Sequence, residues 1–267
     1  MKKSLALATN LYYQAKGREY YREDIFLSEL LRDHFKLLVV HLEDLDCVAS
    51  SVDVILIRNT GPMAEHRTLL SAIQENIEWP IFNDLSGKCD IQGKKHLLSL
   101  FAEGYPVIPT VDSVNEIEKL GKSTNYLIKP IDGCDSHGLQ ILEKEKVEQL
   151  APKGFVIQPT INFKYEVSFY FIGDEFQYAL YAPNPERRWE LVQYLPNKED
   201  IQFAKCFIEW NTCSRGIQRV DACRDQKGDL LLMELEDYNP YLSLELLDRP
   251  TKEKFIERLA KDIINFI

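Results

Sequence analysis

The sequence contains no apolar run approaching the roughly 20 residues needed to cross a bilayer. Its six cysteines form no Cys-x-x-Cys pair and no zinc-type spacing, so we expect reduced thiols and no disulfides. It also lacks an excess of positive charge, and the net charge of −10 argues against a general nucleic-acid-binding surface. Internal repeats and low-complexity tracts are missing too. Together these absences predict a cytoplasmic globular protein with no membrane or nucleic-acid partner.

The N-terminal Met1-Lys2-Lys3 and the apolar residues after it superficially resemble a signal peptide. The apolar stretch is too short for one, and Thr9-Asn10 ends it, so we expect a first buried strand instead. Strands and helices then alternate as in an open α/β layer. The expected strands are 5–8, 36–42, 52–57 and 80–83, with helices at 24–33 and 69–77. The runs 36–42 and 52–57 are short and continuously apolar, so we expect them to be buried parallel strands.

A chain of 267 residues exceeds the usual size of a single core, so we expect more than one subdomain. The divisions fall at 1–84, 85–154 and 155–267. The middle part begins with a helix at 94–103, and Ser113 with Glu116 forms a capping-box pattern for a second helix at 113–120. The remaining expected elements are strands at 126–129, 139–142, 155–158, 166–172 and 175–181, and a closing helix at 251–267.

The most informative segment is a hairpin in which two β-prone runs are joined at Lys227-Gly228. A two-residue loop there places Asp221 directly opposite Glu234, and period-two alternation puts Glu236 on the same face as Glu234. Carboxylates about 5 Å apart repel one another. A divalent cation bound through oxygen relieves this repulsion, and so does protonation of one crowded carboxyl. A solvated strand face is the third interpretation, but the apolar second strand favours the metal.

Three further patterns precede this hairpin in the chain. The first is Asn83…Lys94-Lys-His-Leu-Leu followed by Gly104-Tyr-Pro-Val-Ile-Pro-Thr. The second is Tyr-Leu-Ile-Lys129-Pro-Ile-Asp-Gly-Cys-Asp-Ser-His-Gly, a strand that ends in lysine before a turn of mostly small and polar residues. The third is Phe-Val-Ile-Gln158-Pro-Thr-Ile161, with Glu166 in the next strand.

In this order the four patterns resemble the ATP-grasp superfamily, specifically the small carboxylate–amine ligases related to glutathione synthetase and the RimK group. The resemblance covers about 83–244, and residues 1–84 look like the pre-ATP-grasp domain of that family. It implies an α/β fold, α+β in its C-terminal part. On this interpretation 85–154 is the small lobe with the phosphate lid, and 155–267 is the large lobe with the metal site.

The resemblance also implies roles for individual residues. Lys94, with Lys95 as the adjacent alternative, and Lys129 would contact phosphate. Asp221, Glu234 and Glu236 would bind Mg²⁺ or Mn²⁺, and Arg219 would meet phosphate or the substrate carboxylate as the catalytic residue. The other implied ATP-binding positions are Gly133, Ser136 and Gly138 in the lid, Gln158 and Ile161 at the adenine hinge, and Glu166 at the ribose hydroxyls.

This sequence departs from the family pattern at two places. The lid has two glycines where many members have three or four, with Cys134, Asp135 and His137 in the positions of small residues. Glu236 replaces the commoner Asn of the metal motif, a variant associated with a RimK-like subgroup. Cys134 and His137 are better read as loop residues than as a catalytic dyad, since no third orienting group is apparent.

The activity implied by the resemblance is ATP-dependent joining of a carboxylate and an amine through an acylphosphate. Its partners would be small-molecule or peptide substrates, and a homodimer is expected from the resemblance alone. The alternatives are an ATP-grasp kinase acting on a hydroxyl and a non-catalytic ATP-binding module. Two polar patterns are candidates for substrate selection: Arg187-Arg188-Trp189 in an expected loop, and Arg58-Asn59 at the end of a buried strand.

Overall fold

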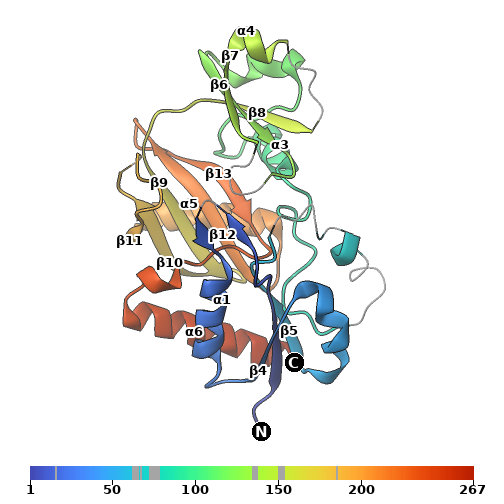
Figure 1. Ribbon diagram of the computed structural model, residues 1–267. Helices are drawn as coiled ribbons and strands as arrows, with labels where there is room; N and C mark the ends of the chain where they lie inside the picture. The colour runs from blue at the N-terminus through green and yellow to red at the C-terminus, as the bar shows by residue number, and fades with distance from the viewer. Residues whose placement is uncertain are drawn as a thin grey trace.

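The computed structural model describes residues 1–15, 17–61, 66, 68–71, 79–133, 138–149, 154–184 and 186–267. A small parallel sheet lies at the bottom of Figure 1, a five-stranded antiparallel sheet lies in the middle, and a small three-stranded sheet forms the top. No helix in the described part of the chain is long and apolar enough to span a membrane.

The bottom sheet has strand β1 (Ser4–Ala8) at its centre, with β4 (Lys36–Val40) and β5 (Val54–Ile57) parallel on either side. β1 and β5 are almost entirely buried, as their continuous apolar sequences predict. The expectation of a buried strand is wrong for β4, where Leu38 and Val39 are 44% and 38% exposed. β4 is an edge strand, and apolar composition alone does not distinguish an edge from a centre.

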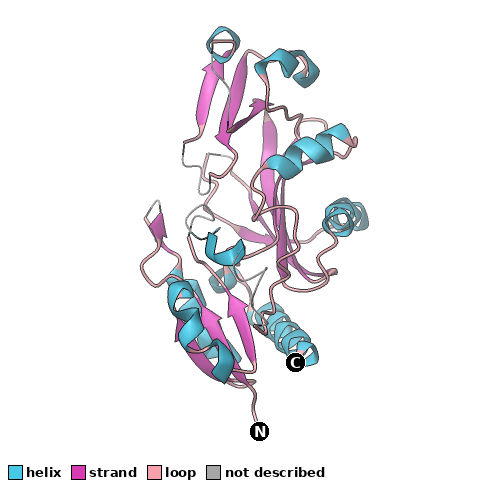
Figure 2. Ribbon diagram, turned by 90° about the vertical axis from the view of Figure 1, so that its right-hand side faces the viewer, coloured by secondary structure: helices cyan, strands magenta, loops and turns pink. Residues whose placement is uncertain are grey.

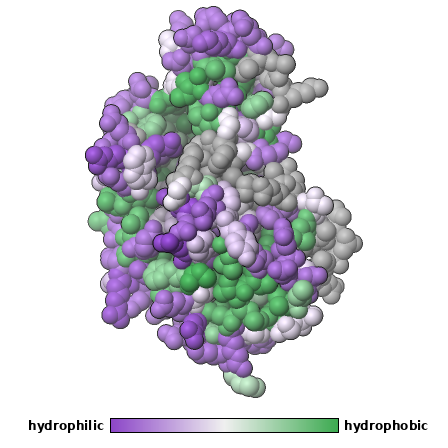
Figure 3. All heavy atoms as spheres, in the orientation of Figure 1, coloured by the Kyte–Doolittle hydropathy of each residue, from purple (hydrophilic) through white to green (hydrophobic). Residues whose placement is uncertain are grey.

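Short elements complete this region. A hairpin of β2 (Gln14–Ala15) and β3 (Arg18–Glu19), which the sequence analysis did not anticipate, leads into α1 (Tyr21–Leu31). The 3₁₀ helices η1 (Leu42–Cys47) and η2 (Ala49–Ser51) connect β4 to β5. Exposed apolar side chains of α1 and β4 contribute to the hydrophobic area in the lower half of Figure 3.

The middle sheet has the order β11-β10-β9-β12-β13, and two helices cover its faces (Figures 1 and 2). Helix α6 (Arg249–Phe266) shares a core with Tyr170 and Ile172, whereas α5 (Lys198–Asn211) packs against Phe169 and Phe171. Because successive side chains of a strand point to opposite faces of the sheet, β9 contributes residues to the core under α6 and to the core under α5. The strands are β9 (Phe163–Ile172), β10 (Glu175–Ala182), β11 (Val192–Tyr194), β12 (Ile217–Asp225) and β13 (Leu230–Glu236).

Helix α5 was missed by the sequence analysis although its start carries a clear signal. Asn197 accepts a hydrogen bond from the backbone N–H of Asp200, and the Asp200 carboxylate accepts one from the backbone of Asn197. This reciprocal capping box satisfies two N–H groups that the helix end leaves unpaired. The predicted box at Ser113 forms only in part: Ser113 caps the 3₁₀ helix η3 (Val114–Leu120), but the Glu116 side chain pairs with Lys119.

The top sheet has the order β7-β6-β8 and its own small apolar core. Its strands are β6 (Asn125–Pro130), β7 (Gln140–Glu143) and β8 (Phe155–Pro159), and α4 (Lys144–Val147) follows β7. Strand β8, which the sequence analysis grouped with the large lobe, pairs with β6 in this sheet. Conversely, α3 (Lys95–Ala102) buries Leu97 and Leu100 in a core of the middle sheet.

The β12–β13 hairpin pairs Asp221 with Glu234 as predicted, but by a different route. The expected two-residue loop is wrong: the backbone N–H of Asp225 donates to Asp229 O at 2.9 Å, so the loop has three residues, 226–228. It ends at Gly228 with φ +102°, a left-handed conformation that suits glycine. This loop alone would shift the pairing by one residue. A bulge that leaves Met233 unpaired restores the expected register.

Candidate active site

Two adjoining cavities lie where the three sheets approach one another. The small cavity has a volume of about 230 Å³ and is walled partly by Tyr13, Asn59 and Asp90. The large cavity has a volume of about 620 Å³ and extends along β9 and β12 toward Lys129 and Trp189. Both are lined by Arg18, Tyr20, Lys94, Gly133, Arg219, Glu234 and Tyr241.

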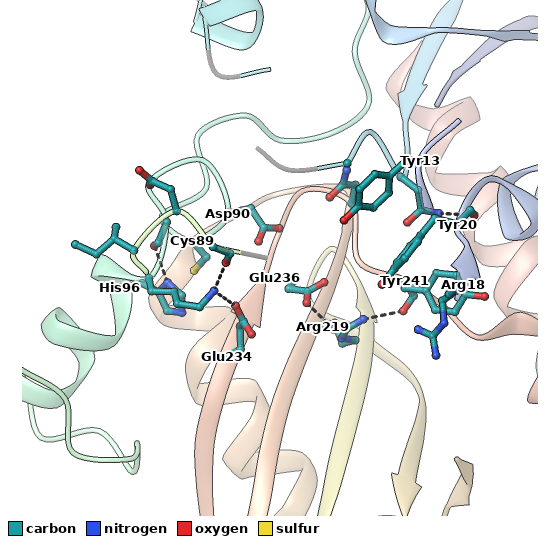
Figure 4. A pocket seen from close by; sticks show the side chains of 18 residues that line it. Tyr13, Arg18, Tyr20, Cys89, Asp90, His96, Arg219, Glu234, Glu236 and Tyr241 are labelled. Carbon is teal, nitrogen blue, oxygen red and sulfur yellow. Dashed lines mark hydrogen bonds and ion pairs between the residues drawn. The ribbon is translucent and has the colours of Figure 1, made fainter. Parts of the chain in front are cut away.

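The three carboxylates of the hairpin lie at this junction but do not face the same space. Asp221 lines the large cavity, Glu236 lines the small one, and Glu234 lines both. The pairing of β12 with β13 brings these residues together: Asp221 lies opposite Glu234, and Arg219 lies opposite Glu236. Figure 4 shows Glu234 and Glu236 on one strand, with Arg219 beside Glu236.

Arg219 occupies the space between two of these carboxylates. Its Nη2 lies 2.8 Å from Asp221 Oδ2 and 2.5 Å from Glu236 Oε1, and its Nη1 donates to the carbonyl oxygen of Tyr241 at 2.9 Å. Asp221 also accepts a hydrogen bond of 2.6 Å from the Ser168 hydroxyl. The repulsion that the sequence predicts is therefore relieved mainly by a guanidinium group, which makes charge-assisted hydrogen bonds to both acids.

The third carboxylate, Glu234, has a different partner. Lys94 Nζ lies 2.7 Å from Glu234 Oε1 and 2.6 Å from the carbonyl oxygen of Gly133. Burial alone would raise the pKa of Glu234, but the positive charges of Lys94 and Lys129 outweigh it and lower that pKa to about 2. For Glu236, burial dominates over the attraction of Arg219 and raises its pKa well above the usual range. Of the outcomes considered for crowded acids, the raised pKa is present at Glu236. The cations that pair with the three carboxylates are Arg219 and Lys94, which the sequence analysis did not consider in this role, and the divalent cation stays a prediction.

The donor set fits magnesium in kind, since it offers hard carboxylate oxygens. Among the described residues, however, no group of three or more His, Cys, Asp or Glu side chains converges closely enough to hold a metal ion unaided. Mg²⁺ typically uses one or two carboxylates together with phosphate oxygens and water. Glu234, which faces both cavities and is 34% exposed, is the best placed of the three to share an ion with a nucleotide.

The structure distinguishes Lys94 and Lys129, the two lysines predicted to contact phosphate, from Lys95, the alternative to Lys94. Lys94 precedes α3 and points into both cavities, whereas the neighbouring Lys95 is exposed and lines neither. Lys129 is the next-to-last residue of β6, lines the large cavity and forms no ion pair with a described side chain. Burial lowers the pKa of Lys129, and the attraction of the nearby Glu234 carboxylate only partly offsets this effect. An anion bound directly to Lys129 in the large cavity would favour its charged form.

The large cavity has a second feature that fits a nucleotide. Glu166 lies on its wall, and one of its oxygens, Oε1, is buried without a hydrogen-bond partner. The other oxygen accepts a hydrogen bond of 2.7 Å from Arg188 Nε. Burial raises the pKa of Glu166, against the attraction of Arg188. A buried acceptor without a partner is costly, and a ligand hydroxyl group would satisfy it.

The other predicted ATP-binding residues differ in whether they line the cavities. Gln158 is fully buried and donates to Thr110 Oγ1 at 2.8 Å, and neither it nor Ile161 is among the cavity-lining residues. Gly133 lines both cavities. A Cβ at Gly138 would approach Pro130 Cγ to 2.8 Å, so this position accepts only glycine without rearrangement. Ser136, Cys134, Asp135 and His137 lie outside the described residues.

The interpretation of Arg58 as a ligand-binding residue is wrong. Its side chain is sealed in the protein, where it lies 3.3 Å from both Glu23 Oε2 and Asp24 Oδ1 and donates to Pro240 O. Asn59 does line the small cavity, although its Nδ2 donates to Asp24 at 2.9 Å. A polar residue at a strand end reaches a ligand only when no part of the protein covers it.

Some residues at the junction escaped the sequence analysis. Asp90 lines the small cavity, and burial together with the negative charge of Asp237 raises its pKa to about 7. Arg18 and Tyr20 come from the unexpected β2–β3 hairpin and the turn after it. No local motif marks these positions, because they reach the site through a connection between elements rather than through a strand or helix pattern.

No protein-family model matches the chain, and a search of curated proteins gives no match. Solved structures do match it over its whole length. The D-cycloserine synthetase DcsG superposes with a TM-score of 0.75 at 18% sequence identity, covering 97% of this chain and 99% of that chain. A D-alanine–D-alanine ligase from Bacillus anthracis, complexed with ATP, gives a TM-score of 0.71 at 16% identity, covering 99% and 96%. The chain has the ATP-grasp fold.

A third solved structure also supports the ATP-grasp fold. The ATP-grasp ligase PsnB complexed with a minimal precursor has a TM-score of 0.68 at 13% identity, covering 98% of this chain and 100% of that chain. Identities this low establish the ATP-grasp fold and not a shared substrate. The predicted fold class is confirmed, while the RimK-like assignment stays a prediction.

Proposed function

We propose that the protein is an ATP- and Mg²⁺-dependent ligase that joins a carboxylate to an amine through an acylphosphate. The observation that carries this proposal is the junction of two cavities in an ATP-grasp fold, with Lys94, Arg219 and Glu234 lining both. A ligase of this kind needs separate spaces for nucleotide and substrate, and cations where phosphate and carboxylate meet.

The large cavity is the proposed nucleotide site. Lys129 is a buried cation without a carboxylate partner, and Glu166 offers an acceptor without a donor. These two groups match a phosphate and a ribose hydroxyl, respectively. Lys94 would reach phosphate from the junction, since its Nζ is held there by Glu234 and Gly133 O.

ATP would supply the phosphoryl group, so that a substrate carboxylate oxygen bonds to phosphorus and ADP leaves. The amine nitrogen then bonds to the acyl carbon, phosphate departs, and the amine loses a proton. The role proposed for Arg219 is electrostatic: it lines both cavities and stabilises negative charge on the carboxylate and the transferred group. For Mg²⁺ we propose Glu234, with Asp221 and Glu236 becoming available as phosphate draws Arg219 away from them.

The test is a pair of measurements on the purified protein. Calorimetry should detect binding of a non-hydrolysable ATP analogue that depends on Mg²⁺. With ATP and candidate substrates, ADP and phosphate should be released together only when an amine is present. A stable phosphorylated product formed without an amine would favour the kinase alternative. Absence of nucleotide binding would refute both enzymatic readings.

A further inference from the structure

Arg18 is a cation at the junction that no described acidic side chain neutralises. It lies on β3 and lines both cavities. The acid next to it in sequence, Glu19, is used elsewhere: it accepts from the Tyr21 hydroxyl at 2.8 Å and pairs with Arg22. The guanidinium of Arg18 therefore faces the cavities without a carboxylate partner among the residues that the structure describes.

Aromatic rings hold this guanidinium in place. Its central carbon lies 4.5 Å from the ring centroid of Tyr241 and 5.8 Å from that of Tyr20. The two rings contact each other edge to face, with centroids 5.3 Å apart. Figure 4 shows Arg18 beside Tyr241 on the side of the cavity opposite Glu234. Cation–π contacts orient a guanidinium group, but they leave its N–H donors unused. These donors lie in one plane and can make two parallel hydrogen bonds to a single carboxylate.

The other guanidinium groups nearby differ in this respect. Arg219 is paired with Asp221 and Glu236, and Arg188 is paired with Glu166. Lys129 is also without a carboxylate, but it lines only the large cavity, where the nucleotide is proposed. Arg18 is thus the described cation at the junction that is open to an anion on the side of the small cavity.

We propose that Arg18 binds a second, non-reacting carboxylate of the substrate and so selects for substrates that carry one. This rests on the proposed ligase function, which consumes one carboxylate and leaves the other to be recognised. A cavity of about 230 Å³ restricts the part of the substrate held there to a small group. The second carboxylate belongs either to the acid that is activated or to the amine that is joined.

The test compares matched ligands on the wild-type protein and on Arg18→Gln, by thermal shift and calorimetry, with and without Mg²⁺ and a non-hydrolysable ATP analogue. Succinate against succinamate represents a diacid donor. Glycine, alanine of either hand and glutamate, each against its α-amide, represent amine acceptors. We expect the wild type to prefer the free carboxylate in one of these sets by about tenfold to a hundredfold, and Arg18→Gln to lose that preference. Arg18→Lys, which keeps the charge but not the fork, should recover part of it.

The matched control is Arg249→Gln, an arginine whose side chain is 87% exposed on α6, which should keep the wild-type preference. Binding of the ATP analogue should be unchanged in Arg18→Gln. A parallel loss of nucleotide affinity would make Arg18 a phosphate ligand and overturn the proposal. So would a wild type that binds none of the free carboxylates in preference to its amide. If the ATP analogue fails to bind any variant, the ligase proposal falls, while the nucleotide-free arm still decides the carboxylate preference.

Discussion

Two arginine–carboxylate clusters in this protein share the same chemistry and differ in their access to solvent. In one, Arg58 pairs with Glu23 and Asp24, and all three side chains are at most 1% exposed. In the other, Arg219 pairs with Asp221 and Glu236, and their side chains are 16–23% exposed on the walls of the cavities. The sealed cluster ties the N-terminal layer to the segment 240–244 that follows β13, whereas the open one lines the two cavities.

The energetic consequences follow from this difference. A charge in the sealed cluster cannot find water or a ligand if its partner is removed, so the cost appears as lost stability. A charge in the open cluster can be rehydrated or can meet a phosphate, so its loss should appear in activity. Burial and not residue type therefore separates the two clusters.

The largest expected effect is on the sealed cluster. Arg58→Met should reduce the free energy of unfolding by about 3–5 kcal/mol, because it leaves two buried carboxyl groups without their cation. Chemical denaturation monitored by circular dichroism measures this. The matched control Arg249→Met removes an exposed ion pair with Glu253 and should change the value by less than about 1 kcal/mol. A small effect of Arg58→Met would show that the cluster is not structural.

The pH dependence of stability gives the next effect. One guanidinium cannot neutralise two carboxyls, and burial raises the pKa of Glu23 to about 7 from 4.5. Between these values the folded state holds a proton that the unfolded state has lost, so stability should fall as pH rises from about 4.5 to 7. The limit is about 1.4 kcal/mol per unit of pKa shift. In Asp24→Asn the remaining acid has Arg58 to itself, so its pKa should drop and the curve should flatten. A wild-type profile that rises with pH over this range would contradict the assignment.

At Glu234, which lies beside the open cluster and pairs with Lys94, the effect should appear in catalysis and not in stability. Glu234→Gln should lower kcat by at least about a hundredfold, because it weakens metal binding and frees Lys94 from its carboxylate. Its melting temperature should stay close to that of the wild type, since the side chain is one-third exposed. Glu257→Gln on the exposed face of α6 is the matched control. Unchanged turnover in Glu234→Gln would remove this residue from the proposed metal site.

The contrast between the clusters also shows how far the sequence can predict this protein. The pairing of Asp221 with Glu234 follows from strand alternation, yet it holds because a bulge at Met233 offsets a loop one residue longer than expected. Local patterns give strands and helices, and a series of such patterns gives the ATP-grasp fold. They do not show that Arg58 is covered by α1, since Glu23 is 35 residues away in the chain.

The same limit applies to the site. Lys94, which lines both cavities, could be singled out from the sequence because it belongs to a spaced motif, whereas Arg18 lies in a two-residue strand without a periodic pattern. Its relation to Tyr241 depends on segments from opposite ends of the chain meeting at one cavity. Residues of this kind become visible only when the tertiary contacts are known.

The smallest of the expected effects concerns Lys129, which lies between the two extremes because it is buried but faces a cavity. Lys129→Met should weaken binding of an ATP analogue about tenfold, since one charge-assisted contact to phosphate is lost. Burial lowers the pKa of Lys129, so in the wild type its proton is lost at a lower pH than from an ordinary lysine. Nucleotide affinity should therefore decline as pH rises through the alkaline range, and this decline should be shallower in Lys129→Met. Lys146→Met, at a side chain that is 63% exposed, is the control and should match the wild type at every pH. Equal affinities of Lys129→Met and the wild type would place the phosphates elsewhere.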